Sequence, residues 1–229
     1  MKMRLIGLIH LSLMLAFVAC DSGPKEGEEY LYYGEQLNHE KAKKRDSAMK
    51  NLAQLKDKRS VPALNKALSN GHAHIKPGMV KLVTDLADPS SVQPLIDAID
   101  WRAGAGRDKT GKMLAVANER IAKALGRLAK PDNKAAIEAL IKLADSNHLN
   151  TQLAAVVSLG DLKAEAAVDQ LVLVADGSSN NFMVKNAAIA LGKIASGKAV
   201  PVLIKLLFFE RAGVSFYAEA SYSLFQIGK

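Results

Sequence analysis

Apolar residues recur at helical spacing in short blocks, and the blocks come in pairs. The clearest pair spans residues 184–207. Its apolar positions follow a period of three to four residues up to Ile194 and again from Val200, which predicts two amphipathic helices. Ser196-Gly197 interrupts the pattern between them and marks a tight turn. Two helices this short cannot bury their apolar faces alone, so we expect the pair to stack on similar units.

The same pair of blocks recurs along the chain. Taking a leucine of the second helix as the anchor of each unit, successive anchors are 31, 45, 31 and 32 residues apart; they are Leu64, Leu95, Leu140, Leu171 and Leu203. A first helix precedes each anchor; these helices end at Leu55, Leu86, Leu128, Leu162 and Ile194. A repeated period of this kind is the signature of a solenoid, in which each unit contacts only its neighbours.

Three of the first helices share a short phrase, in which a small residue, a leucine and a glycine follow one another. It reads Ala124-Leu125-Gly126, Ser158-Leu159-Gly160 and Ala190-Leu191-Gly192. With the period and the turns, this phrase makes residues 41–229 similar to HEAT repeats, especially the short bacterial type also found in phycobilisome lyases. We therefore predict an all-α fold, a right-handed α-α superhelix of about five helix pairs plus a partial sixth.

The array departs from its period at two places. The longest step contains a Gly-rich, basic insertion at about residues 100–113, which holds the only tryptophan, Trp101. At the other place, residues 215–227 have the pattern of a first helix, and the sequence stops where its second helix would start. A solenoid normally ends in a capping unit with a polar outer face. We expect the 229 residues to be the front part of a longer chain; otherwise this last helix caps the array alone.

The beginning of the chain has the composition of a targeting signal. Two positive residues precede a mostly apolar run from Leu5 to Ala19. That run has about the length of a signal-peptide core and is short for a membrane span, which needs roughly 20 residues. The run ends at Ala19-Cys20, in a pattern that resembles a bacterial lipoprotein signal. Phe17 departs from the leucine usual three positions before the cysteine, which leaves ordinary cleavage and a secreted protein as the alternative.

The lipoprotein resemblance implies an organisation and a location. Residues 1–19 would be the signal peptide, Cys20 would carry the lipid, and residues 20–40 would be the lipidated cysteine and a polar tether. The protein would then be lipid-anchored at the bacterial cell envelope, on the periplasmic or outer side of a membrane. Two or more acyl chains are enough for stable anchoring.

Composition supports the helical interpretation and adds a charge. Apolar residues make up 49% of the chain and aromatic residues 5%. This excludes a disordered chain and favours helices packed through small and branched side chains. The net charge is +8, of which Lys2 and Arg4 contribute two. The remainder is moderate and is consistent with an acidic partner or with anionic lipid. A single cysteine excludes an intramolecular disulfide.

Candidate catalytic and ligand groups are few. The stretch from Gly106 to Lys112 nearly matches a phosphate-binding loop, but Met113 stands where a Ser or Thr must hold magnesium, so we expect no nucleotide. HEAT-like hydroxylases bind iron through several His-Glu pairs; this sequence has one, His39-Glu40, besides the turn residues His72-Ala73-His74. We therefore expect no metal and no other cofactor. With no nucleophile motif in view, we also expect no catalytic residues and no enzymatic activity.

The predicted function is that of a non-catalytic protein-binding scaffold or assembly factor. Its expected partners are other envelope proteins and the membrane, which it would reach through the lipid. We expect no binding to nucleic acid. Second helices would line the concave surface; their candidate binding residues are Asn65, Lys66, Gln93, Asp97, Glu138, Lys142, Gln170 and Lys205. A second candidate is a hot spot in the insertion, since Trp and Arg are enriched in hot spots; it comprises Trp101, Arg102 and Arg107. The alternative is a lyase-like enzyme or cofactor chaperone with a tetrapyrrole or similar ligand.

Two surface features have two interpretations each. A basic run would face anionic lipid or form the solvated face of the first helix; it contains Lys41, Lys43, Lys44, Arg45, Lys50, Lys56, Lys58 and Arg59. The late aromatic residues would pack in the core or form an exposed patch; they include Phe182, Phe208, Phe209, Phe216, Phe225, Tyr217 and Tyr222. We favour the solvated face and the core.

Overall fold

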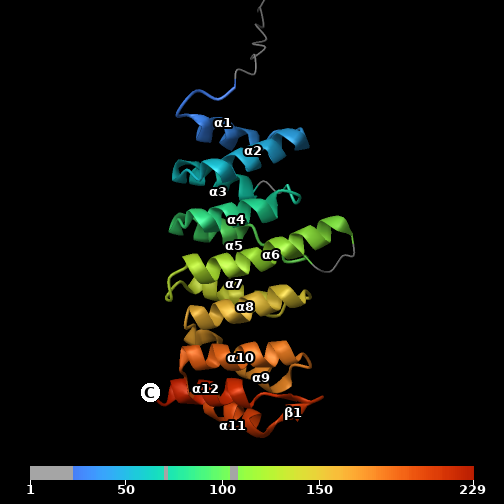
Figure 1. Cartoon of the computed structure of the whole chain (residues 1–229), viewed down its shortest axis with the longest axis vertical. Coiled ribbons are helices and arrows are strands. Elements are labelled where there is room, and N and C mark those ends of the chain that lie inside the picture. The colour runs from blue at the N-terminus through green and yellow to red at the C-terminus, as the bar shows by residue number, and fades with distance from the viewer. Residues whose placement is uncertain (1–22, 70–71, 104–107) are drawn as a thin grey trace, which may run out of the picture.

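The computed structural model describes residues 23–69, 72–103 and 108–229, and its helices stack along one long axis (Figure 1). The first helices of the units are α2 (Ala42–Leu55), α4 (Lys76–Leu86), α6 (Lys109–Leu128), α8 (Leu149–Asp161), α10 (Asn181–Ile194) and α12 (Tyr217–Ile227). The second helices are α3 (Val61–Ser69), α5 (Val92–Asp97), α7 (Lys134–Leu143), α9 (Val168–Gly177) and α11 (Val200–Phe208). The predicted all-α solenoid is confirmed.

A short 3-10 turn leads into the second helix in most units. These turns are η1 (Lys58–Ser60), η2 (Pro89–Ser91), η3 (Glu165–Ala167) and η4 (Gly197–Ala199). Just before each turn, one residue adopts a left-handed backbone conformation, with φ between 50° and 61°; these residues are Lys56, Ala87, Lys163 and Ala195. One left-handed residue of this kind ends a helix, so the chain can turn back and place the second helix beside the first.

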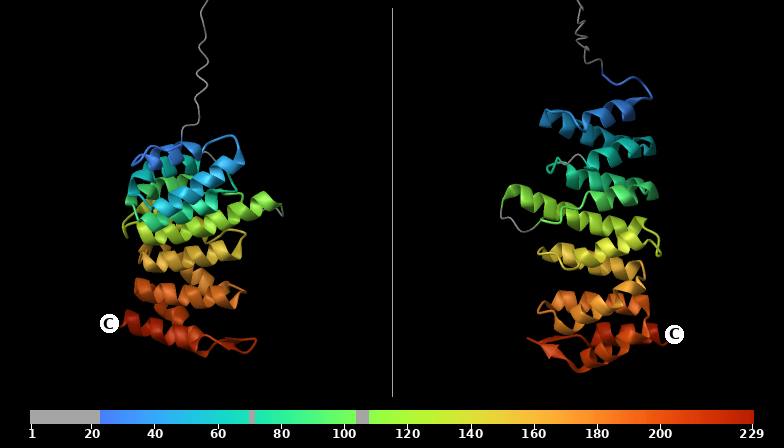
Figure 2. Two further views of the ribbon diagram at one scale, coloured as in Figure 1. Left: turned by 45° about the horizontal axis from the view of Figure 1, so that its top comes forward. Right: turned by 180° about the vertical axis from the view of Figure 1, so that it is seen from behind.

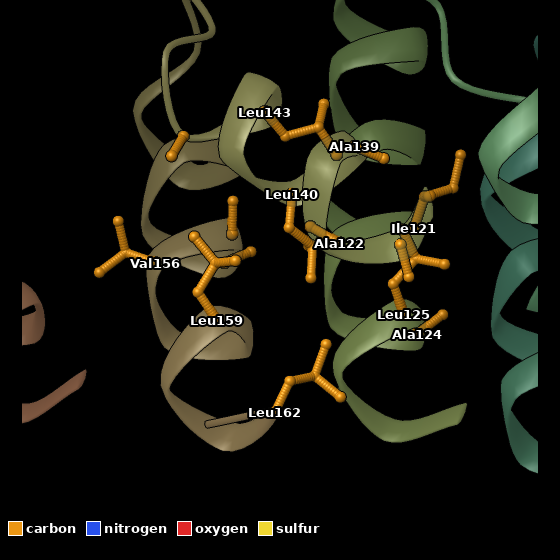
Figure 3. Packing of buried hydrophobic residues seen from close by; sticks show 14 of the residues in the cluster. Ile121, Ala122, Ala124, Leu125, Ala139, Leu140, Leu143, Val156, Leu159 and Leu162 are labelled. Carbon is orange, nitrogen blue, oxygen red and sulfur yellow. The ribbon is translucent and has the colours of Figure 1, made fainter. Parts of the chain in front are cut away.

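The anchor leucines of the second helices fill the space between neighbouring first helices. All five, Leu64, Leu95, Leu140, Leu171 and Leu203, have no exposed surface. Figure 3 shows one of them, Leu140 of α7, between Leu125 of α6 and Leu159 of α8. Since the same position is buried in every unit, the repeat register read from the sequence is the register of the core.

Glycines let three pairs of first helices approach closely. A Cβ atom added at Gly126 would lie 2.5 Å from Ser158 Oγ, and one added at Gly192 would lie 2.5 Å from Ser223 Oγ. At Gly160, the added Cβ would lie 2.8 Å from the Cα of Ala190. These glycines are those of the phrase seen in the sequence, so its physical reason is contact between first helices.

The array begins earlier than predicted. Residues 20–40 were expected to form a tether, but α1 (Glu29–Gln36) packs against α2 and α3. Gly34 is buried, and a Cβ there would lie 2.7 Å from that of Ala63. The guanidinium of Arg59 lies 4.3 Å from the ring centroid of Tyr30. Aromatic side chains and a small residue therefore attach this segment to the first unit. Of the expected tether, the structure describes only residues 23–28 ahead of α1.

The predicted insertion at 100–113 is also shorter than expected. Helix α6 begins at Lys109, because Asp108 caps it: the Asp108 carboxylate accepts a hydrogen bond from the Gly111 backbone N–H at 3.0 Å. An aspartate cap of this type stabilises a helix start even where glycine follows. The first turns of α6 project beyond the neighbouring helices (Figures 1 and 2).

A hairpin between α11 and α12 was not predicted. Strands β1 (Glu210–Arg211) and β2 (Val214–Ser215) pair antiparallel, and Ala212 and Gly213 between them have φ values of 50° and 74°. Arg211 donates hydrogen bonds to Asn181 Oδ1 at 2.6 and 2.8 Å, which ties the hairpin to the start of α10. The expected helix at 215–227 is present as α12.

Candidate protein-binding surface

The loop after α5 is fixed in place by a buried asparagine of α6. Asn118 accepts a hydrogen bond from the backbone N–H of Asp100 at 3.2 Å and donates one to the Asp100 carbonyl at 2.8 Å. The Asp100 carboxylate in turn accepts from the backbone N–H of Arg102 at 2.9 Å. Trp101 therefore stands on a backbone segment that is held from both sides.

A buried lysine supports the same corner. Lys76, at the start of α4, is only 7% exposed, and its Nζ donates a hydrogen bond to the Ala98 carbonyl at 3.0 Å. Burial lowers the pKa of Lys76, and the nearby Asp100 carboxylate opposes part of that change. Arg120 of α6 donates to the Pro77 carbonyl at 2.7 Å. These contacts join α4, the end of α5 and α6 into one rigid base.

Trp101 is 47% exposed and meets a lysine from the next unit. Lys142 Nζ of α7 lies 4.1 Å from the Trp101 ring centroid, within the range of a cation–π contact. A small pocket of about 250 Å³ opens beside them, and Asp100, Asp145 and Asn147 contribute to its wall. We call Asp100, Trp101, Lys142, Asp145 and Asn147 the Trp101 cluster. It joins the predicted loop hot spot to one residue of the predicted second-helix set.

The other predicted residues lie as follows. Lys66, Asp97, Glu138 and Arg102 are exposed, and Asn65 and Gln170 are half-buried. Two are engaged by neighbours: Gln93 Nε2 donates to Asp97 Oδ1 at 2.9 Å, and Lys205 of α11 forms an ion pair with Asp176 of α9. Arg107 and Cys20 lie outside the described residues. Partner binding by any of these residues stays a prediction.

Larger hollows lie on the first helices, and the larger one is lined in part by Lys50, Lys56 and Lys58 of the basic run. One of about 680 Å³ lies between α2 and α4, and one of about 490 Å³ lies mainly between α6 and α8. The signal in the sequence is position-specific: the residue two places before Leu55 of α2 is Ala53, and the matching positions of α6, α8 and α10 have glycine. This difference between alanine and glycine can be interpreted only once the contacts of the glycines in the structure are known.

The histidines are engaged locally. His39 Nδ1 accepts from the Lys41 backbone N–H at 3.0 Å, and His74 Nε2 lies 3.6 Å from Asp46 Oδ1. Burial lowers the pKa of His72, and the nearby positive charge of Arg45 and then His74 add to this. Within residues 23–69, 72–103 and 108–229, no three His, Cys, Asp or Glu side chains are placed to hold a metal ion. No helix in these ranges is both long and apolar enough to cross a membrane.

Most late aromatic residues are on the surface, against expectation. Phe216 is fully buried, and Phe209 stacks on it with ring centroids 5.8 Å apart. The exposed ones are Phe182, Phe208, Phe209, Phe225, Tyr217 and Tyr222. The interpretation of these residues as core therefore holds for Phe216, whose ring is enclosed at the hairpin, and fails for the exposed ones.

Comparison with known proteins agrees with this architecture. Residues 137–213 match the family model for HEAT repeats, and residues 44–70 match that for PBS lyase HEAT-like repeats. The chain is thus an all-α solenoid, and two of its segments are similar to HEAT repeats. A similar solved structure is human deoxyhypusine hydroxylase in complex with glycerol, at 14% identity, with 88% of this chain and 85% of that chain covered and a TM-score of 0.42. No curated protein matches the sequence.

This comparison overturns one expectation from the sequence. We expected no enzymatic activity because no nucleophile motif or ligand set was recognisable. The similar structure is that of a hydroxylase, and it aligns with most of this chain. The expectation that the chain is not an enzyme is therefore withdrawn. A likeness at this identity and TM-score assigns no reaction to this protein.

Proposed function

We propose that the protein is a protein-binding scaffold or assembly factor, held at the bacterial cell envelope by a lipid on Cys20. The observation that carries the binding role is Trp101, an exposed indole on a clamped loop beside Lys142. The partners would be other envelope proteins. The proposal concerns binding and does not depend on whether the chain also catalyses a reaction.

The Trp101 cluster has the features of a binding hot spot. Trp and Arg are enriched among residues whose truncation costs about 2 kcal/mol or more of binding free energy. Because Asn118 holds the loop backbone, little conformational entropy would be lost when a partner covers the indole. Asp100, Asp145 and Asn147 surround it with polar groups, as at the rim of a protein interface.

The second-helix layer favours a protein partner over a polyanion. Its exposed residues are of mixed charge, with Lys66 on α3, Asp97 on α5 and both Glu138 and Lys142 on α7. A long nucleic acid would require a continuous positive stripe. An extended rigid surface of mixed charge instead provides specificity through many modest contacts.

The binding role can be tested by crosslinking in cells. A photo-crosslinking residue at Glu138, on α7 next to the Trp101 cluster, should capture a partner, and Trp101→Ala in the same chain should abolish the product. Purified with that partner, Trp101→Ala should raise the Kd by about thirtyfold, which corresponds to about 2 kcal/mol.

Two controls keep this test specific. Phe225→Ala truncates an exposed aromatic side chain on α12, in the first-helix layer, and should leave the Kd unchanged. A crosslinker at Val157, on α8, should not yield the same product. If Trp101→Ala binds as well as the wild type, or if both crosslinking positions yield one product, the partner contacts a different surface.

The anchor requires a separate test. Cells expressing the wild type and Cys20→Ser would be labelled with a fatty-acid probe and then fractionated. We expect label on the wild type only, and release of Cys20→Ser from the membrane fraction. An unlabelled wild type would exclude the lipid and leave a secreted scaffold.

A further inference from the structure

The groove between α2 and α4 combines an apolar lining with positive charge. Buried Leu82 and Leu86 and half-buried Met49 lie in it, together with Ala53 and Gly78. Four exposed lysines line the same groove, with one acidic residue, Asp85; the lysines are Lys50, Lys56, Lys58 and Lys81. We call this site of about 680 Å³ the α2–α4 groove.

Helix α2 has no glycine at the position where α6, α8 and α10 contact the next first helix. Gly126, Gly160 and Gly192 lie so close to that helix that an added Cβ would clash with it. The matching residue of α2 is Ala53, and it is exposed. The residues that line the hollow come mostly from α2 and α4, which are successive first helices of the stack. Of the apolar residues that line the groove, Met49 and Ala53 have accessible surface, and Leu82 and Leu86 are buried.

The positive charge of the groove is largely uncompensated. Asp85 is bound to Lys81, with 2.5 Å between the Lys81 Nζ and the carboxylate. No ion pair to Lys50 or Lys56 occurs in the part of the chain that the structure describes. Lys58 lowers the pKa of Asp88, after the larger effect of hydrogen bonds from Ser90. A ligand that brings carboxylates would therefore meet two or three free cations.

The groove between α6 and α8 provides the contrast. Its Lys123 is paired with Glu119 at 2.6 Å, and its Asp161 is paired with Lys193 at 2.6 Å. Of its charged residues, only Arg127 has no ion pair within the described residues. An excess of lysines is thus specific to the α2–α4 groove and not a general property of the first-helix layer.

We propose that the α2–α4 groove binds an acidic amphipathic segment of a partner protein. Its apolar side chains would pack on Met49 and Ala53, beside the buried Leu82 and Leu86, and its carboxylates would face Lys50, Lys56 and Lys58. A membrane surface is disfavoured, because lipid headgroups would contact the exposed lysines and leave the recessed leucines uncovered. This site is separate from the Trp101 cluster and goes beyond the proposed function.

Peptide selection tests the proposal before the partner has been identified. Random peptides of about 16 residues, roughly four helical turns, would be displayed on phage and selected on the purified protein. Binders that also recognise Ala53→Trp would be removed, since this change fills the groove without altering its charge. We expect the remaining peptides to carry Asp or Glu beside apolar residues spaced three or four apart.

Charge variants then locate the binding. Synthetic peptides would be measured by fluorescence anisotropy against Lys50→Glu/Lys81→Glu and against the matched pair Lys123→Glu/Arg127→Glu in the α6–α8 groove. The first pair and Ala53→Trp should raise the Kd at least about tenfold. The matched pair, and Ala166→Trp at an exposed site in η3, should change it less than about threefold.

Three results would overturn the proposal. Selected peptides without acidic residues would remove the charge argument, and an equal loss in both charge variants would mean unspecific attraction. The groove would be assigned to lipid by two results together. No peptide is enriched, and the protein sediments with phosphatidylglycerol vesicles unless Lys50→Glu/Lys81→Glu is present. None of these results bears on Trp101→Ala, so failure here and failure of the scaffold proposal are distinguishable.

Discussion

Single residues in this solenoid are conspicuous where they break the pattern of a buried apolar core, and Lys76 is the clearest case. Its ammonium group is buried and has one hydrogen bond, to the Ala98 carbonyl. Burying a charge costs free energy, which is why the pKa of Lys76 lies below its usual 10.5. Lys76 supports the loop that carries Trp101. The free-energy cost of burying its charge would therefore be linked to the geometry of the candidate binding surface.

The lowered pKa of Lys76 predicts a pH dependence. Between this pKa and 10.5 the unfolded chain binds more protons than the folded one, so the free energy of unfolding rises with pH there. Below the folded-state pKa both states are protonated and the cost is constant. We expect the stability of the wild type relative to Lys76→Met to increase as pH approaches 10.5, measured by urea unfolding. A relative stability that is constant with pH would contradict it, and Lys66→Met, exposed on α3, is the control.

At the scale of elements, the contact between first helices depends on glycine. In Gly192→Ala the new Cβ would lie 2.7 Å from the Cα of Ser223, so α10 and α12 would have to separate. Overpacking of this kind costs about 1–3 kcal/mol, more than the gain of up to about 1 kcal/mol from replacing glycine in a helix. We expect a lower thermal midpoint. Gly177→Ala, with no neighbour within 4 Å of the new Cβ, should be neutral or stabilising. Equal midpoints for the two variants would mean that the interface adapts freely.

Elements with regular packing were predictable, and elements set by local contacts were not. The anchor leucines and the small-Leu-Gly phrase recur because the same contact recurs, so their spacing revealed the units. The start of α6 depends on one cap, Asp108, inside a stretch whose glycines indicate a loop. The hairpin depends on a two-residue turn at Ala212 and Gly213. Its strands have only two residues each, too few to show an alternating pattern of apolar and polar residues.

The candidate binding surfaces were predictable in part, because they too depend on contacts between units. Trp101 and Lys142 were each singled out from the sequence, but their contact depends on how one unit is rotated against the next. The α2–α4 groove lies where one contact between first helices is missing, and a missing contact has no sequence pattern. Ala53 becomes informative only when it is compared with the glycines of later units.

For the whole molecule, this missing contact predicts an uneven stability along the stack. The stability of a solenoid is approximately a sum over units and over the interfaces between them. The interface between α2 and α4 lacks the glycine contact that joins α6, α8 and α10, so helices α1–α3 should open before the centre of the stack. Native-state hydrogen exchange would measure this.

Leucines at the same position of three first helices can be compared in that experiment. Leu52 of α2, Leu159 of α8 and Leu191 of α10 all have fully buried side chains. If the interfaces differ by about 1.4 kcal/mol or more, amides around Leu52 should exchange at least about tenfold faster than those around the other two. Binding of an acidic peptide in the α2–α4 groove should slow exchange in α2 and leave α10 unchanged, because the peptide would supply the contact that α4 does not make. Equal protection of α2 and α10 in the free protein would show that the groove weakens nothing, and would place the cooperativity of the stack in the second helices.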